Sequence, residues 1–249
     1  MTEKPSPRLR TVEKIKPPFP LNEFPRDFGI KLGRQLIYLL ATKGQPVIEG
    51  PEWERIFAEC VGATWKPSNV GLDDVILDTC AWGAKTVKAT KPSTQKKVRL
   101  ISGRNSPTYS FGDSEITKVD PNALGVKILD IWNERVSAVR KKHKHVRTVV
   151  LMKSNTLEEV AVFEFDTIRY DPELYQWKWN KKNNLEGFGK SSDIHCFTWQ
   201  PHGSQFTIIE NVPDEVLIVK IKTPHVLDRD SFLQTIGFSD DWVTVIRKK

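Results

Sequence analysis

Two aspartates and a lysine lie close together in neighbouring apolar segments of the chain. Asp73 and Asp74 fall within residues 72–78, and Lys85 falls within residues 79–89. If these segments pair as strands, a carboxylate and an ammonium group can meet at one point. A carboxylate is a hard oxygen ligand for Mg²⁺, and a neighbouring lysine can orient water and offset developing negative charge. The pattern therefore suits metal-assisted cleavage of a phosphodiester.

The alternation of side chains along a strand limits which of these groups can meet. It places Ala81, Gly83 and Lys85 on one face, and it sends only one of Asp73 and Asp74 inward. The spacing does not decide between the two aspartates. An ordinary surface hairpin with a solvated acid and a solvated lysine is the alternative interpretation of the same residues.

The charge distribution around Lys85 favours an anionic partner. The 249 residues carry 38 Lys and Arg against 31 Asp and Glu, a net charge of +7. Between Thr79 and Gly112 there is no acidic residue, which makes this stretch suitable for binding phosphates. A solvated basic hairpin is the alternative. The basic residues of the stretch are Lys85, Lys88, Lys91, Lys96, Lys97, Arg99 and Arg104.

Three further segments carry side chains that suit nucleic-acid contacts. Residues 102–110 form a polar turn, residues 199–206 form a polar loop, and residues 177–184 alternate aromatic with basic and amide side chains. Ordinary turns and core aromatic residues are the alternatives. With Lys88, the candidates for DNA contact are Arg104, Asn105, Lys178, Lys181, Gln200, His202 and Gln205.

The order of predicted elements indicates an α/β protein with a mixed central sheet flanked by helices. Residues 1–27, with six prolines, are expected to form an extended arm, and residues 28–249 a single domain. Its core is expected at about 50–166, with an accessory, less regular part at 167–249. Apolar periodicity predicts helices at 29–42, 50–62 and 122–142, and strands at 72–78, 79–89, 97–102, 147–153, 159–166 and 216–222.

This order, with an acid in the first hairpin strand and a lysine in the second, resembles the αβββαβ core of the PD-(D/E)XK nuclease superfamily over residues 50–166. In context it looks like a type II restriction endonuclease with additional C-terminal strands and loops. The resemblance implies that Asp74 binds Mg²⁺, that Lys85 positions the attacking water and that Glu54, on the preceding helix, completes the site. It also implies double-stranded DNA as substrate and a homodimer.

One position departs from the family pattern. The second acid of the family stands two residues before the lysine, where this chain has Gly83, and a register that uses Lys88 puts Thr86 there. The replacement candidates are Glu54, Asp78, Asp113 and Glu115, and Glu54 is preferred because its helix packs beside the first strands in this fold.

Other features exclude several classes of protein and leave two alternatives. The three cysteines lack zinc spacing, no apolar run approaches a membrane span, and a cytoplasmic location is expected. A non-catalytic DNA-binding module on a degenerate nuclease scaffold is the main alternative, and Gly83 favours it. A nuclease for RNA processing or repair, which prefers structure to sequence, is a weaker one.

Overall fold

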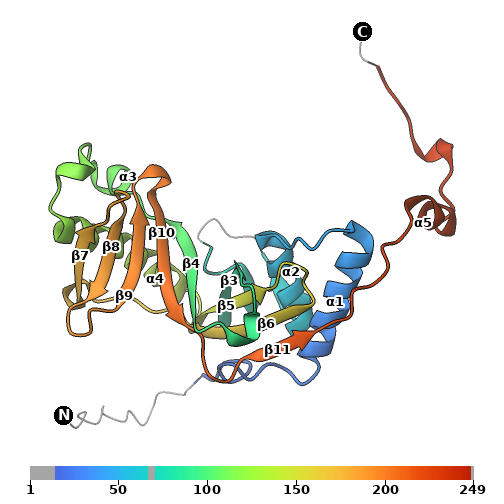
Figure 1. Cartoon of the computed structure of the whole chain (residues 1–249), viewed down its shortest axis with the longest axis horizontal. Helices are drawn as coiled ribbons and strands as arrows, with labels where there is room; N and C mark the ends of the chain where they lie inside the picture. Colours follow the sequence, from blue (N-terminus) through green and yellow to red (C-terminus); the bar gives the residue numbers. More distant parts are fainter. Residues whose placement is uncertain (1–14, 67–70, 248–249) are drawn as a thin grey trace.

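Two β-sheets organise the chain, and the strands of each come from segments far apart in the sequence (Figure 1). The computed structural model describes residues 15–66 and 71–247. Within them, the first sheet is mixed and has the strand order β1-β2-β3-β5-β6-β11. Its strands are β1 (Thr64–Trp65), β2 (Val75–Leu77), β3 (Cys80–Lys88), β5 (His145–Lys153), β6 (Glu159–Asp166) and β11 (Leu217–Lys220).

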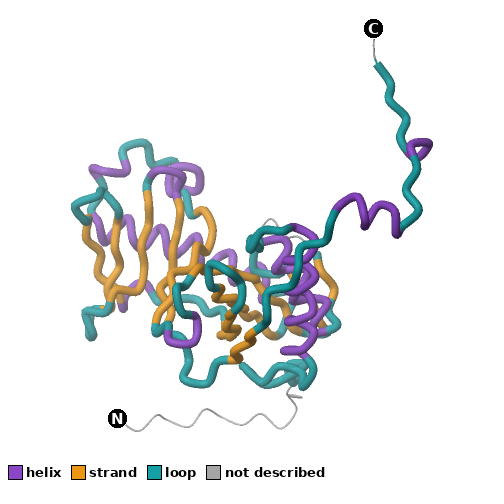
Figure 2. The backbone as a smooth tube through the Cα atoms, turned by 45° about the vertical axis from the view of Figure 1, so that its right-hand side comes forward, coloured by secondary structure: helices purple, strands orange, loops and turns teal. Residues whose placement is uncertain are grey.

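The second sheet is antiparallel throughout and has the order β4-β10-β9-β8-β7. It lies to one side of the mixed sheet, as the tube in Figure 2 also shows. Its strands are β4 (Lys97–Arg104), β7 (Tyr175–Trp179), β8 (Leu185–Gly189), β9 (His195–Gln200) and β10 (Gln205–Asn211).

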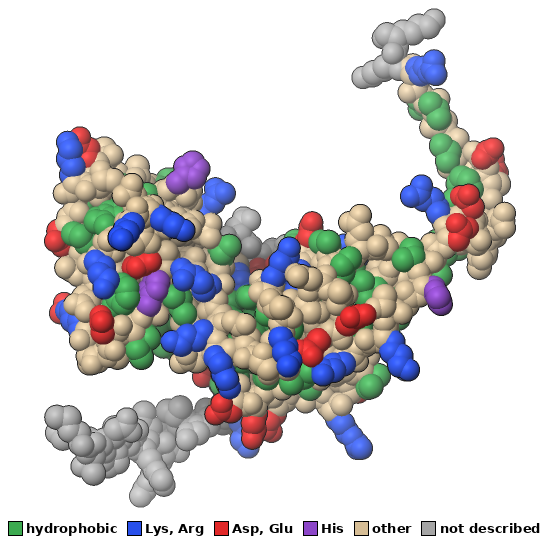
Figure 3. Space-filling view, in the orientation of Figure 1, with side chains coloured by type: hydrophobic (Ala, Val, Ile, Leu, Met, Phe, Trp, Pro, Cys, Tyr) green, Lys and Arg blue, Asp and Glu red, His purple; other side chains and the backbone are tan. Residues whose placement is uncertain are grey.

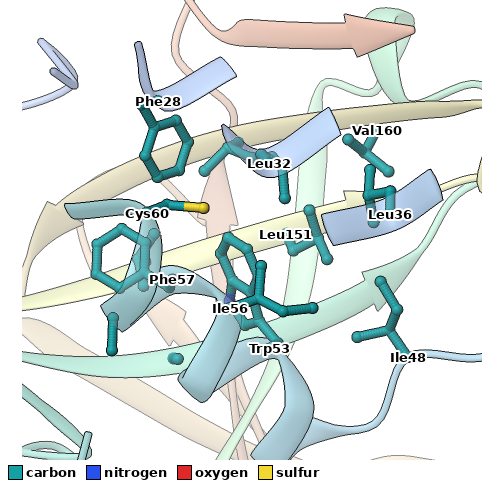
Figure 4. Close-up of a cluster of buried hydrophobic side chains, with 14 of the residues drawn as sticks. Phe28, Leu32, Leu36, Ile48, Trp53, Ile56, Phe57, Cys60, Leu151 and Val160 are labelled. Carbon is teal, nitrogen blue, oxygen red and sulfur yellow. The ribbon is translucent and has the colours of Figure 1, made fainter. Parts of the chain in front are cut away.

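Helices α1 (Phe28–Lys43) and α2 (Gly50–Val61) bury their apolar sides against the mixed sheet. In Figure 4, Phe28 and Leu32 of α1 and Phe57 of α2 lie around a shared core with Leu151 of β5. A capping box formed by Glu49 and Glu52 fixes the start of α2. Each helix ends at a glycine in the left-handed conformation, which a residue without a Cβ adopts easily.

The long helix α4 (Pro121–Arg140) lies between β4 and β5 in the chain. Its apolar side chains form one core with buried residues of both sheets. Asp120 caps its start by accepting from the backbone N–H groups of Asn122 and Ala123. The remaining helices are the short α3 (Pro107–Phe111) and α5 (Arg229–Thr235). No helix in the described ranges is both long enough and apolar enough to cross a lipid bilayer.

The central strand β3 confirms the predicted alternation of faces. Trp82 lies in the core under α1 and α2, whereas Ala81 lies in the core with α4. Strand β3 pairs antiparallel with β2 and parallel with β5. Gly83 and Lys85 therefore lie on the side of the sheet that faces away from Trp82.

The predicted α/β class is confirmed, but the third predicted strand does not lie in the mixed sheet. β4 pairs with β10 of the second sheet instead. Val98 and Leu100 of β4 are buried, whereas Lys97 and Arg99 are exposed. One face of β4 therefore packs on the core and the other faces solvent. Such a strand suits an antiparallel sheet with a solvated face, whereas β5 is buried on both faces.

At both ends of the chain, the described residues belong to the folded domain to a greater extent than the sequence predicted. Residues 167–211, expected to be less regular, contain four strands of the second sheet, and β11 returns to the mixed sheet. The described part of the N-terminal arm packs on its own domain, because Phe19 stacks on Trp82 and Phe24 stacks on Phe28. Residues 1–14 lie outside the described ranges.

Candidate functional site

Asp74 and Lys85 lie just beyond the paired part of β2 and β3, which ends at Val75 and Trp82. Asp74, just before β2, is only 3 % exposed. The Lys85 amine donates a hydrogen bond of 3.3 Å to the carbonyl oxygen of Gly71, three residues before Asp74. Burial lowers the pKa of Lys85 below its ordinary value, and the Asp74 carboxylate opposes that shift. The acid and the lysine singled out in the sequence therefore belong to one electrostatic cluster.

The structure distinguishes the two neighbouring aspartates. Asp73 is half-buried, and its carboxylate acts on His143 rather than on Lys85. Burial lowers the pKa of His143, and Asp73 opposes that shift. Asp74 is therefore the aspartate that acts on the lysine, and both aspartates precede β2 rather than lying in a strand.

Glu54 is the only one of the four replacement candidates that acts on Lys85. Its carboxylate opposes the lowering of the Lys85 pKa by burial. It also accepts a hydrogen bond of 3.1 Å from the indole N–H of Trp65. The others have different surroundings. Asp78 lies in the turn between β2 and β3, Asp113 pairs with Lys127 at 2.7 Å, and Glu115 pairs with Lys118 at 2.9 Å.

Gly83 lacks a side chain for a steric reason that the sequence does not reveal. A Cβ at this position would lie 2.7 Å from the carbonyl oxygen of Gly71 and 3.1 Å from the Cα of Leu72. Both are backbone atoms, which cannot move aside as the end of a flexible side chain can. The segment that leads to Asp74 thus occupies the space that a carboxylate two residues before Lys85 would need.

Arg135 of α4 is a further member of the cluster, and the sequence did not single it out. Its guanidinium donates to the carbonyl of Ser102 at 2.8 Å and to Oδ1 of Asn105 at 3.3 Å. Burial lowers its pKa, and the Asp74 carboxylate opposes that shift. The guanidinium lies against Gly103, where a Cβ would be 2.3 Å from Nη1. The only sequence signal was a basic residue among the apolar positions of the predicted helix.

Among the candidates for DNA contact, Asn105 has a structural role instead. It is fully buried, and its amide donates to the carbonyl of Ile128 at 2.9 Å and accepts from Arg135. Its backbone carbonyl also accepts from the indole N–H of Trp199 at 2.8 Å. These bonds occupy the groups that were expected to contact DNA, so the side chain is unavailable to a ligand in this arrangement.

Several other candidates gather at one end of the second sheet. Arg104, Gln205 and Gln200 are in register on neighbouring strands β4, β10 and β9. His202 lies in the β9–β10 turn, and Lys181 lies in the β7–β8 turn, which the register places at the same end.

The remaining two candidates have other surroundings. Lys178, on β7, lies with its amine 4.0 Å from the centre of the Phe188 ring. Lys88 lies towards the opposite end of β4, where it lines a cavity of about 470 Å³ with Lys97 and Arg99. Lys and Arg side chains are spread across both sheets on the face drawn in Figure 3.

The carboxylates that act on Lys85 are of the chemical kind that Mg²⁺ prefers as ligands. No group of three His, Cys, Asp or Glu side chains suited to a metal ion is present within residues 15–66 and 71–247. Mg²⁺ sites often use one or two carboxylates, with waters and substrate phosphates as the other ligands. Asp74 and Glu54 are two carboxylates that act on the same amine, and they are the residues that would hold such an ion.

Comparison with known proteins gave no match. No family model, curated protein or solved structure matches this chain. The candidate function therefore has to be argued from the residues and their geometry.

Proposed function

We propose that this protein is a Mg²⁺-dependent endodeoxyribonuclease of the type II restriction kind. The observation that carries the proposal is that the Lys85 amine donates to the backbone three residues before Asp74, and that the carboxylates of Asp74 and Glu54 both act on this amine. A partly buried lysine whose pKa is shifted by burial and by two carboxylates is a candidate for a functional site, because such groups are concentrated there.

Each group in the cluster has a chemical role in this proposal. Asp74 and Glu54 would hold the metal through their carboxylate oxygens, and Asp74 also interacts electrostatically with the cationic groups of Lys85 and Arg135. A bound Mg²⁺ supplies Lewis-acid stabilisation of the scissile phosphate and a more acidic water. Because burial lowers the pKa of Lys85, its amine more readily becomes neutral and can accept a proton from the attacking water.

The second sheet supports duplex DNA as the substrate. Its end carries Arg104, Gln205 and Gln200 in one row across three adjacent strands. Arginine can bond to guanine and glutamine to adenine through two atoms each in the major groove. Adjacent strands are about 4.8 Å apart, so the three side chains span roughly 10 Å, which is comparable to the width of that groove. This row is the proposed base-reading element.

Digestion of linear phage DNA tests the proposal as a whole. Incubation with Mg²⁺ is expected to give discrete bands, and chelation with EDTA is expected to prevent cleavage. A smear from duplex DNA, or cleavage of structured RNA alone, would instead favour the processing or repair alternative. If Asp74→Ala and Lys85→Ala both retain full cleavage activity, the assignment of these residues to the active site is wrong.

A second candidate function rests on Gly83. The close approach of the Gly71 carbonyl excludes a carboxylate there, and that same carbonyl accepts from Lys85. Both features suit a scaffold that binds DNA without cutting it. Tight, salt-dependent binding to duplex DNA with no cleavage in Mg²⁺ or Mn²⁺ would select this alternative.

A further inference from the structure

The C-terminal segment, residues 222–247, forms an arm that extends away from the body of the molecule (Figures 1 and 2). Its root follows α1, where the backbone N–H of Leu227 donates to the carbonyl of Ala41 at 2.8 Å. Beyond the root, apolar side chains are exposed to solvent, and Val245 and Ile246 are 78 % and 84 % exposed. The other large exposed apolar residues of the arm are Val226, Leu227, Phe232, Ile236, Phe238, Trp242 and Val243. Exposed apolar segments of this kind mark interaction sites.

A groove of about 780 Å³ lies elsewhere on the same molecule, along the outer edge of β11. One wall is formed by residues 214–220 and the other by residues 22–26 with Gly29 and Ile30. Successive residues of a strand point to opposite faces of a sheet, so a groove lined by every residue of β11 follows its edge. Within the described residues β11 pairs only with β6, which leaves its outer backbone groups available to another strand.

The end of the arm is complementary to this groove in both backbone preference and charge. Residues 243–246 read Val-Thr-Val-Ile, a run of β-branched residues, and Arg247, Lys248 and Lys249 follow them. The groove carries three acids, Glu23, Asp214 and Glu215, against two basic residues, Arg26 and Lys220. Lys220 is paired with Glu159 at 3.3 Å, so the acidic residues dominate the unpaired charge.

We propose that residues 243–247 of a second copy of this chain add as a strand to the edge of β11, so that two copies exchange arms. Such strand addition gains affinity from backbone hydrogen bonds, and side-chain contacts give it specificity. Residues 222–242 include α5 and a short 3-10 turn at Asp240–Trp242, and with about 3.3 Å per extended residue, 1.5 Å per α-helical residue and 2 Å per 3-10 residue they can span up to about 50 Å, so the arm is long enough to reach a neighbour. The exchange is reciprocal, which gives a closed dimer with two identical contacts.

The direction of the arm is the reason for choosing a second copy as the partner. The arm leads away from the domain that carries the groove (Figure 2), and within the described residues Val243, Val245 and Ile246 are 57 %, 78 % and 84 % exposed. The contact does not depend on the proposed nuclease activity. A dimer without cleavage would leave the inference standing, and cleavage by a monomer would leave the proposed function standing.

Sedimentation velocity of the full-length chain is the first test. The wild type is expected to be a dimer at 10 µM, and the double variant Val245→Asp with Ile246→Asp is expected to weaken the dimer at least tenfold. Ile218→Lys, on β11, is expected to have the same effect from the acceptor side. Leu174→Asp changes another exposed apolar residue, 60 % exposed and outside the arm and groove, and it should leave the dimer unchanged. A monomeric wild type, or a dimer insensitive to either variant, would overturn the inference.

A disulfide crosslink between chains distinguishes a second copy from the chain's own arm. In a Cys196→Ser background, a chain with Ile218→Cys is mixed with a differently tagged chain with Val245→Cys. The two other cysteines, Cys60 and Cys80, are buried. Oxidation is expected to give a covalent heterodimer carrying both tags. If a single chain carrying both cysteines closes only on itself, the arm belongs to its own groove and the inference is wrong.

Discussion

Two groups of charged residues lie on opposite sides of the central strand β3, and they differ in how exposed their cationic side chains are. On the α1 and α2 side, Arg147 and Glu164 form an ion pair of 2.8 Å, with 4 % and 0 % of the side chains exposed. Both carboxylate oxygens of Glu164 are used, because Oε1 also accepts from the N–H of Asn22 and Oε2 accepts from Trp82 at 2.6 Å. We call this the closed pair.

On the other side, Asp74, Lys85, Glu54 and Arg135 form what we call the open cluster. Lys85 is only partly buried, and its hydrogen bond to Gly71 is long at 3.3 Å. Its pKa is lowered because burial outweighs the attraction of the two carboxylates. The closed pair has the features of a structural ion pair, whereas the open cluster has a partly exposed amine whose pKa is lowered by burial. We therefore expect the closed pair to govern stability and the open cluster to govern chemistry.

The largest expected change in stability comes from breaking the closed pair. Arg147→Met leaves the Glu164 carboxylate buried without its cation, which typically costs about 3–5 kcal/mol. Urea unfolding followed by circular dichroism measures this cost. Replacing both partners, with Arg147→Met and Glu164→Leu, is expected to cost much less than the single change. A single-variant cost below about 1 kcal/mol would contradict the structural role of the pair.

A smaller loss of stability is expected from a substitution at Gly83, where the backbone of Gly71 approaches β3. In Gly83→Ala the new Cβ is forced against the Gly71 carbonyl, and overpacking of this kind costs about 1–3 kcal/mol. Gly50→Ala is the matched control, because a Cβ there meets nothing within 4 Å. Chemical denaturation should show a clear loss for the first variant and none for the second. Equal behaviour would mean that residues 71 and 72 move aside easily.

Lys85→Met should change stability little at neutral pH, within about 1 kcal/mol, because Arg135 still offsets Asp74. The difference from wild type should depend on pH. The folded pKa of Lys85 is lowered, so between that value and its ordinary 10.5 the unfolded state binds more protons. The stability of the wild type relative to Lys85→Met should therefore rise with pH in this window. Thermal melts from pH 7 to pH 10 measure it, and parallel profiles would contradict a lowered pKa of Lys85 in the folded state.

The smallest effect is expected at Asp73, the aspartate that acts on His143. Asp73→Asn removes the carboxylate that opposes the shift of His143, so the pKa of His143 should fall further. Titration of the histidine by NMR measures this change, and stability should alter by less than about 0.5 kcal/mol, as for most surface substitutions. An unchanged His143 titration would show that the two groups do not interact.

Local sequence patterns were sufficient for much of the fold. The apolar period of α2 and α4 and the alternation in β3 gave their positions within one or two residues. The partner of β4 was not predictable in this way, because the strand that pairs with it, β10, lies about a hundred residues later. Strands β7 to β10 are short and rich in polar residues, so their individual patterns are weak.

The candidate site was predictable only in part. Residue types and spacing suggested Asp74 with Lys85, and the resemblance suggested Glu54. The clash at Gly83 and the contribution of Arg135 depend on backbone and helix positions that only the folded chain defines. For the same reason, Asn105 looked like a surface donor in the sequence although tertiary contacts bury it.

Cleavage of a supercoiled plasmid in Mg²⁺ by the wild type, Asp74→Asn and Asp73→Asn tests the central claim most directly. The two variants make the same chemical change at adjacent positions, and only Asp74 belongs to the open cluster. We expect the wild type to cut and Asp74→Asn to be slower by at least about 100-fold, because the loss of one catalytic group commonly costs that much. Asp73→Asn should stay within about threefold of the wild type. Equal rates for all three proteins, or a larger loss in Asp73→Asn, would contradict the assignment of the open cluster as a nuclease site.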